Sequence, residues 1–145
     1  LCDAQGVKLS DCFANSFCLS ADVSNAFDPN WPETCDKRNN SQLNYGVAIC
    51  KYTGSRGKGG ASDASAEAMG HVRSTLDKAG VIWQIATLGK VDQGGGGTVA
   101  AYMANRNIVT VDAGVPVLSM HAPLELVSKL DCYETMLACK AIYLA

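Results

Sequence analysis

Short apolar runs separated by polar or glycine-rich stretches follow one another along the chain. Such runs, bounded by turn-forming residues, are typical of buried strands. The run at 108–115 is apolar enough to be buried on both faces of a sheet. After Pro116, residues 117–121 are expected to remain extended. The pattern therefore predicts strands at residues 17–21, 45–52, 81–88 and 108–115.

Stretches with helical spacing lie between and after these runs. From 62 to 79, apolar residues recur every three or four positions, Ser62 or Asp63 can cap the first turn, and Gly80 can end the helix. A second helix is predicted at 98–105. The remaining predictions are helical turns at 23–27 and 123–128, a helix at 131–144, a polar surface loop at 33–44 and a mobile loop at 53–60.

The alternation of strands and helices predicts one α/β unit with a mixed or mostly parallel sheet covered on both faces. No repeat or linker divides residues 1–145. Ligand groups in such sheets gather where the strands end. Asp22 follows the first predicted strand, residues 94–98 follow the third, and His121 follows the region of the fourth. We expect these three places to converge.

Composition narrows the class of protein. The chain has 145 residues, of which 48% are hydrophobic and 18% charged, as in a globular domain. Its net charge of −2 argues against binding to nucleic acid, and no apolar run is long enough to predict a membrane span. Seven cysteines cannot all pair within one chain and lack zinc-finger spacing, so we predict reduced thiols in a cytoplasmic protein.

Two side chains could carry metal chemistry, and each has an ordinary structural alternative. Asp22 could be the N-cap of a short helix. His121 lies in an apolar segment between Pro116 and Pro123 and could be a hydrogen-bonded core residue. The other histidine, His71, is predicted to lie on a helix surface. Spacing alone identifies no catalytic set.

The glycine run at 94–97 precedes a predicted helix, where main-chain N–H groups could meet an anion or a substrate backbone. It lacks the spacing of a dinucleotide fingerprint. The basic segment at 54–59 lacks the leading Gly and the Ser or Thr of a P-loop. We therefore expect no nucleotide to bind.

Five segments, in order along the chain, resemble the M18 metallo-aminopeptidases, the aspartyl aminopeptidase and aminopeptidase I family, in the form found in clostridia and related bacteria. The resemblance covers nearly the whole chain and is specific as an ordered set. The segments are Leu-Ser-Ala-Asp-Val at 19–23, Asp-Pro-Asn at 28–30, residues 51–58 with 62–64, residues 88–98, and residues 112–122 with Ser-Met-His at 119–121.

The resemblance implies an α/β/α sandwich that is interrupted by a smaller dimerisation domain, and two divalent metal ions. These would be zinc, with cobalt or manganese as alternatives. Asp22 would be a terminal ligand of one ion and His121 a ligand of the other. Lys51 would hold a substrate carboxylate, or would simply end its strand in solvent. The peptide would meet a wall formed by Gly95, Gly96, Gly97 and Thr98.

The family's other ligands and its general-base Glu are expected upstream of this chain, which then contains no catalytic residue. The chain would be the C-terminal part of a catalytic domain, inactive alone, whose partners are a peptide substrate, the missing N-terminal half and further copies. The resemblance implies a homo-oligomer built from dimers, with a dodecamer as one candidate. Asn25 and Asp28 stand where other members carry His, so a preference for acidic N-terminal residues is left open. The alternative is a non-catalytic half-domain that works only within an oligomer.

Overall fold

A computed structural model describes residues 1–53, 62–90 and 92–145. Most of the loop predicted at 53–60 lies outside this part of the chain. Two 3-10 turns occupy Asp3–Gln5 and Pro32–Thr34. The helices are α1 (Leu9–Ala14), α2 (Ala66–Ala79), α3 (Ala100–Ala104) and α4 (Lys129–Tyr143), and the strands are β1 (Phe17–Asn25), β2 (Val47–Cys50), β3 (Trp83–Ala86), β4 (Val109–Leu118) and β5 (Leu126–Val127).

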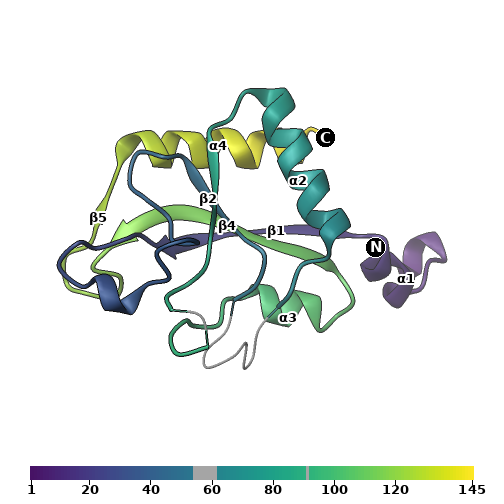
Figure 1. The fold of residues 1–145 in the computed structure, drawn as a ribbon. Coiled ribbons are helices and arrows are strands. Elements are labelled where there is room, and N and C mark those ends of the chain that lie inside the picture. The colour runs from purple at the N-terminus through teal and green to yellow at the C-terminus, as the bar shows by residue number, and fades with distance from the viewer. Residues whose placement is uncertain (54–61, 91) are drawn as a thin grey trace.

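The strands form one mixed sheet in the order β1-β4-β2-β3, with β5 pairing with the end of β4. β1 runs parallel to β4 and β2 parallel to β3, whereas β2 and β4 are antiparallel. Figure 1 shows α2 and α4 on one face of the sheet and α3 on the other. The predicted α/β/α arrangement around a mixed sheet is confirmed.

The main hydrophobic core lies between the sheet and the pair α2 and α4. Alternate residues of a strand point to opposite faces, so one set from each central strand meets these helices. Val47 and Ile49 come from β2, and Val111 comes from β4. Val72 and Leu76 of α2 complete this centre, and both are almost fully buried.

Helix α2 begins later than predicted, because Ser65 rather than Ser62 or Asp63 caps it. The Ser65 side chain accepts a hydrogen bond from the main-chain N–H of Ala68. Asp63 instead forms an isolated antiparallel bridge with Tyr52. At the other end Gly80 adopts a left-handed conformation, with φ of 68°, and ends the helix as predicted.

Two buried carboxylates on α4 fasten this helix to the loops that lead into β2 and β3. Asp131 accepts hydrogen bonds of 2.8 Å from the main-chain N–H groups of Asn44 and Gly46. Glu134 accepts one of 2.9 Å from the N–H of Ile82. These carboxylates therefore satisfy three main-chain donors, of which the one on Gly46 belongs to a buried residue.

Two predicted helical segments contain strand residues and no helix in the structure. The helical turns predicted at 23–27 are wrong because β1 continues to Asn25 in parallel register with β4. The helical stretch predicted at 123–128 is wrong because β5 lies within it and pairs with Val117 and Leu118. The 33–44 loop is only partly a surface loop, since Ser41 is fully buried and its hydroxyl donates to the carbonyl of Asn25. In all three places, contacts distant in sequence override the local pattern.

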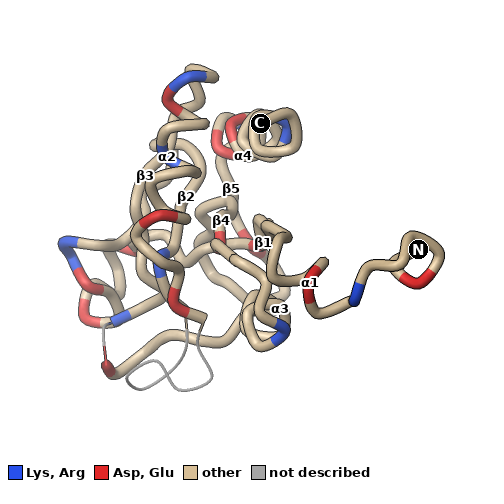
Figure 2. Tube along the Cα trace, turned by 90° about the vertical axis from the view of Figure 1, so that its right-hand side faces the viewer, with Lys and Arg blue, Asp and Glu red and all other residues tan. Residues whose placement is uncertain are grey.

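The N-terminal 3-10 turn and α1, which the pattern did not predict, contain no buried residue. Figure 2 shows this segment projecting from the rest of the molecule, and shows the described Lys and Arg residues scattered rather than gathered on one face. All seven cysteines are free thiols. Within the described ranges, no helix has both the length and the apolar character needed to cross a membrane.

Candidate metal and substrate site

A polar group of side chains projects from the sheet face opposite α2 and α4. In the register of β1 and β4, Ser20 pairs with Asp112 and Asp22 with Gly114. Paired residues in adjacent strands point to the same face. A Cβ atom at Gly114 would lie 1.9 Å from the carbonyl oxygen of Asp22. Glycine is therefore required where β4 passes Asp22.

Asp22 lies inside β1 and is exposed. The N-cap alternative is therefore wrong, because no helix follows it. One oxygen of its carboxylate accepts a 2.8 Å hydrogen bond from the main-chain N–H of Val23. The residue borders a cavity of about 500 Å³ together with Gly97, Thr98 and Tyr102. Asp22 thus faces an open space beside the start of α3.

His121 lies in an exposed turn after β4, so the alternative of a core histidine is wrong. Its backbone φ is +66°, a conformation that non-glycine residues seldom adopt and that costs on the order of 1 kcal/mol. The main-chain N–H of His121 donates to the Glu125 carboxylate, which helps to hold the turn. His121 borders a cavity of about 250 Å³ with Asn25, Leu88, Gly95 and Gly96.

Residues 95–98, called here the glycine segment, contribute to the lining of both cavities. Gly95 and Gly96 line the cavity beside His121, and Gly97 and Thr98 line the one beside Asp22. A small cavity of about 10 Å³, roughly the space of one water molecule, lies between Asp22, Thr98 and Asp112. Asp22 and His121 thus border different cavities, each of which is lined by a different part of the glycine segment.

Lys51 is not part of this arrangement. Its ammonium group forms an ion pair with the carboxylate of Asp63, and both side chains are partly exposed. Lys51 does not line the three cavities that border Asp22, His121 and the glycine segment. The structure therefore places Lys51 beside an acidic side chain of its own chain.

Sequence reasoning missed Asp112, which is buried on β4. Burial raises the pKa of the Asp112 carboxyl above its ordinary value, and the negative charge of Asp22 acts in the same direction. The hydroxyls of Ser20, Thr98 and Thr53 oppose this shift. Ser20 and Thr53 are close enough to favour the ionised carboxylate but do not reach hydrogen-bonding geometry. The signal in the sequence was a single acidic residue inside the apolar run 108–115.

Cys50 lies across the sheet from Asp112, on the same face. Burial raises the pKa of the Cys50 thiol to about 11, and the negative charge of Asp112 acts in the same direction. A contact of 3.6 Å with the hydroxyl of Ser24 opposes these two effects. Burial and the nearby carboxylate therefore favour the neutral form of the Cys50 thiol.

The donor chemistry of Asp22 and His121 fits zinc, which binds carboxylate oxygen and imidazole nitrogen. Two side chains are too few for a closed site, since protein zinc is almost always held by three or four. Across residues 1–53, 62–90 and 92–145, no three His, Cys, Asp or Glu side chains gather closely enough to hold a metal ion. Asp22 and His121 therefore form no closed zinc site with the other described residues.

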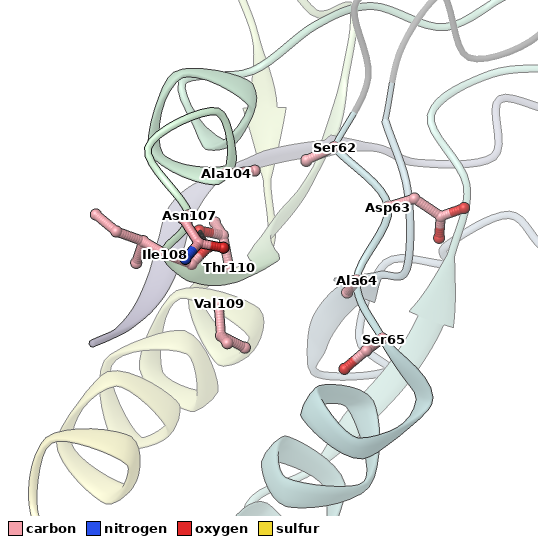
Figure 3. A pocket seen from close by; sticks show the side chains of 9 residues that line it. All are labelled: Ser62, Asp63, Ala64, Ser65, Ala104, Asn107, Ile108, Val109 and Thr110. Atoms are coloured by element: carbon pink, nitrogen blue, oxygen red, sulfur yellow. Dashed lines mark hydrogen bonds between the residues drawn. The ribbon is translucent and has the colours of Figure 1, made fainter. Parts of the chain in front are cut away.

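A separate cavity of about 250 Å³ lies between the start of α2 and the turn that joins α3 to β4. Figure 3 shows Asn107 and Thr110 on one side of it and Ser65 on the other, while the carboxylate of Asp63 points away. None of the predicted metal ligands or residues of the glycine segment lines this cavity. The candidate site is therefore the face that carries Asp22, His121 and the glycine segment.

A sequence model of the family described as aminopeptidase I zinc metalloprotease (M18) matches residues 3–143. The chain belongs to the M18 peptidase family. It is 52% identical over 133 residues to a probable M18 family aminopeptidase 1 of Clostridium acetobutylicum, and the match covers 92% of this chain and 29% of that protein.

Solved M18 structures have the same fold. The crystal structure of aminopeptidase I from Clostridium acetobutylicum matches with a TM-score of 0.89 and 48% identity, over 97% of this chain and 31% of that one. The Thermotoga maritima M18 aminopeptidase matches with a TM-score of 0.90 and 45% identity, over 97% and 32%. The chain therefore spans less than a third of the length of these relatives.

Proposed function

We propose that this chain supplies two metal ligands and a substrate wall to an M18 zinc aminopeptidase, which removes the N-terminal residue of peptides. The observation that carries the proposal is the glycine segment, which lines both the cavity beside Asp22 and the cavity beside His121. A peptide lying along this wall would pass both proposed ligands.

In this proposal Asp22 binds one zinc ion through a carboxylate oxygen, and His121 binds the other through an imidazole nitrogen. A pair of bound zinc ions supplies a nucleophilic water at neutral pH and polarises the scissile carbonyl. The roles of this chain are to hold the ions and to align the peptide. The remaining ligands and the general base would come from residues outside these 145, so the chain alone is expected to be inactive.

The glycine segment suits a peptide because residues without side chains allow a substrate backbone to approach closely. Gly95, Gly96 and Gly97 would form this surface, and Thr98 would end it at the start of α3. Lys51 could hold the carboxylate of an acidic N-terminal residue only after leaving Asp63. Lys51 is thus the least supported of the proposed substrate contacts, and the preference for acidic residues depends on it.

The proposal extends to the whole protein, meaning a polypeptide of the relatives' length that carries these residues. We propose that it is a cytoplasmic homo-oligomer built from dimers. Exposed apolar residues on α4, among them Leu130, Tyr133 and Met136, are compatible with further contacts. Light scattering of the purified whole protein tests the oligomer, and a monomeric mass would contradict it.

The function is tested with the whole protein and its variants Asp22→Ala and His121→Ala. Zinc content is measured by mass spectrometry of the metal, and activity with aminoacyl-nitroanilides. Each variant is expected to lose zinc and to lower kcat/KM by more than about 100-fold, which is beyond the loss typical of groups that only support a ligand. Retention of zinc and of near-wild-type activity by either variant would contradict the assignment of that residue.

Matched controls are Asp36→Ala and His71→Ala. Asp36 accepts a hydrogen bond from the main-chain N–H of Arg38, and His71 contacts Phe17 on the outside of α2. Both variants are expected to keep zinc and activity. A whole protein that assembles into oligomers without binding zinc would support the non-catalytic alternative instead.

A further inference from the structure

Asp112 is a buried carboxylate that the proposed metal site does not use. It lies in the middle of β4, only 6% exposed, and pairs across the sheet with Ser20 of β1 and Cys50 of β2. No Lys or Arg among the described residues forms an ion pair with it. A buried carboxylate is costly unless hydrogen bonds hold it. Within the described part of the chain, Thr98 is the residue that reaches it with hydrogen-bonding geometry.

The hydroxyl of Thr98 lies 3.0 Å from one oxygen of Asp112 and 2.9 Å from the other. An ionised carboxylate can only accept, so Thr98 must be the donor. The same hydroxyl oxygen accepts a 3.2 Å hydrogen bond from the main-chain N–H of Ala100. The result is a chain of hydrogen bonds that runs from the first turn of α3 through Thr98 to β4.

This chain of hydrogen bonds is placed where it can fix the glycine segment. Asp112 is two residues from Gly114, the position that faces Asp22, so the support and the proposed ligand share one stretch of β4. Gly95, Gly96 and Gly97 have no side chains with which to anchor themselves. Thr98 is the first residue after them with a side chain, and that side chain is held by Asp112.

We propose that Asp112 is a positioning residue, which holds Thr98 and with it the glycine segment as the wall along which a peptide lies. Asp112 acts through Thr98 and does not touch the substrate. This inference rests on the proposed function for the role of the wall in peptide binding. The claim that Asp112 immobilises the glycine segment is independent of the proposed function.

In the whole protein, changes at Asp112 and at Thr98 should alter KM in related ways. Asp112→Ala removes both acceptors, so the wall loosens and KM is expected to rise about tenfold, with kcat changed much less. Asp112→Asn keeps an acceptor oxygen for Thr98 and should restore most of the loss. Thr98→Val removes the donor and should raise KM as Asp112→Ala does. The double variant should add little to either single change, because both act through one hydrogen bond.

A second measurement does not depend on activity. Hydrogen exchange of main-chain amides at 95–101 should be faster in Asp112→Ala than in the wild type. Asp131→Asn is the matched control, since Asp131 is also a buried carboxylate but binds main-chain N–H groups of the loop before β2, away from the glycine segment. It should lower the melting temperature while leaving both KM and exchange at 95–101 unchanged.

Three outcomes overturn the proposal. The first is unchanged exchange at 95–101 in Asp112→Ala. The second applies if the wild-type protein is active: it is a change of KM in Asp112→Ala that is no larger than the change in Asp131→Asn. The third is loss of zinc equal to that in Asp22→Ala, which would make Asp112 a metal ligand. If the wild type hydrolyses no aminoacyl substrate, the proposed function fails, and the exchange measurement alone decides whether Asp112 positions the segment.

Discussion

The two faces of the sheet are built differently. Beneath α2 and α4 the strands present Val47, Ile49 and Val111, and the buried carboxylates of α4 are satisfied by main-chain N–H groups. The opposite face presents Asp112 and the exposed Asp22, with α3 as a short covering helix. The first face is covered by α2 and α4 and packed with apolar side chains. The second face carries the polar side chains of the candidate site.

One face of the sheet thus contributes mainly to stability, and the other mainly to the candidate site. Alternate residues of the same strands serve the two purposes, because side chains along a strand point to opposite faces. In β4, Val111 packs in the core while its neighbour Asp112 supports the candidate site. Changes on the two faces should therefore have separable consequences.

The largest expected effect on folding comes from the core face. Leu76→Ala removes a side chain that is 1% exposed and should lower the free energy of unfolding by about 2–5 kcal/mol. Val99→Ala, at the exposed start of α3, should change it by less than about 0.5 kcal/mol. Urea denaturation of the two variants measures both. Equal losses would contradict the distinction between the faces.

A smaller loss in the free energy of unfolding is expected where β4 passes β1 beside Asp22. Gly114→Ala places a Cβ against the Asp22 carbonyl and should cost about 1–3 kcal/mol while displacing Asp22, so zinc content should also fall. A Cβ at Gly70 of α2 would instead meet open space, and Gly70→Ala should stabilise the helix by about 0.5–1 kcal/mol. Denaturation and zinc analysis of both variants test this contrast. A stable, zinc-loaded Gly114→Ala protein would be inconsistent with the strand geometry.

The smallest effect concerns the pH dependence of stability through Cys50. Burial raises the pKa of this thiol to about 11 from an ordinary value of 9.0, so between these values the folded protein binds more protons than the unfolded chain. The free energy of unfolding therefore falls as pH rises through this window, by on the order of 1–2 kcal/mol. Cys50→Ala should lack this component. Parallel stability curves of wild type and variant from pH 8 to 11 would refute it.

Much of the fold could be predicted from the sequence because its main elements have strong periodic patterns. The α2 region shows helical spacing and ends at Gly80 as predicted, and β4 follows an apolar run. The end of β1 could not be found in this way, because residues 22–25 are extended only through pairing with β4. The same holds for β5, whose two residues carry no pattern of their own.

The candidate site was predictable only in part. Asp22, His121 and the glycine run stand at the ends of predicted elements, where ligands gather in α/β sheets. The ion pair of Lys51 with Asp63 depends on how β2 meets the segment before α2, which spacing does not show. The link from Asp112 to Thr98 joins residues 14 positions apart and becomes visible only when α3 packs on β4.

Anomalous diffraction from crystals of the zinc-loaded whole protein tests the central claim most directly. The account predicts zinc peaks beside the glycine segment, with an Asp22 carboxylate oxygen and a His121 ring nitrogen each at about 2.0–2.2 Å from a zinc ion. Zinc peaks remote from both side chains, with Asp22 and His121 free of metal, would contradict it.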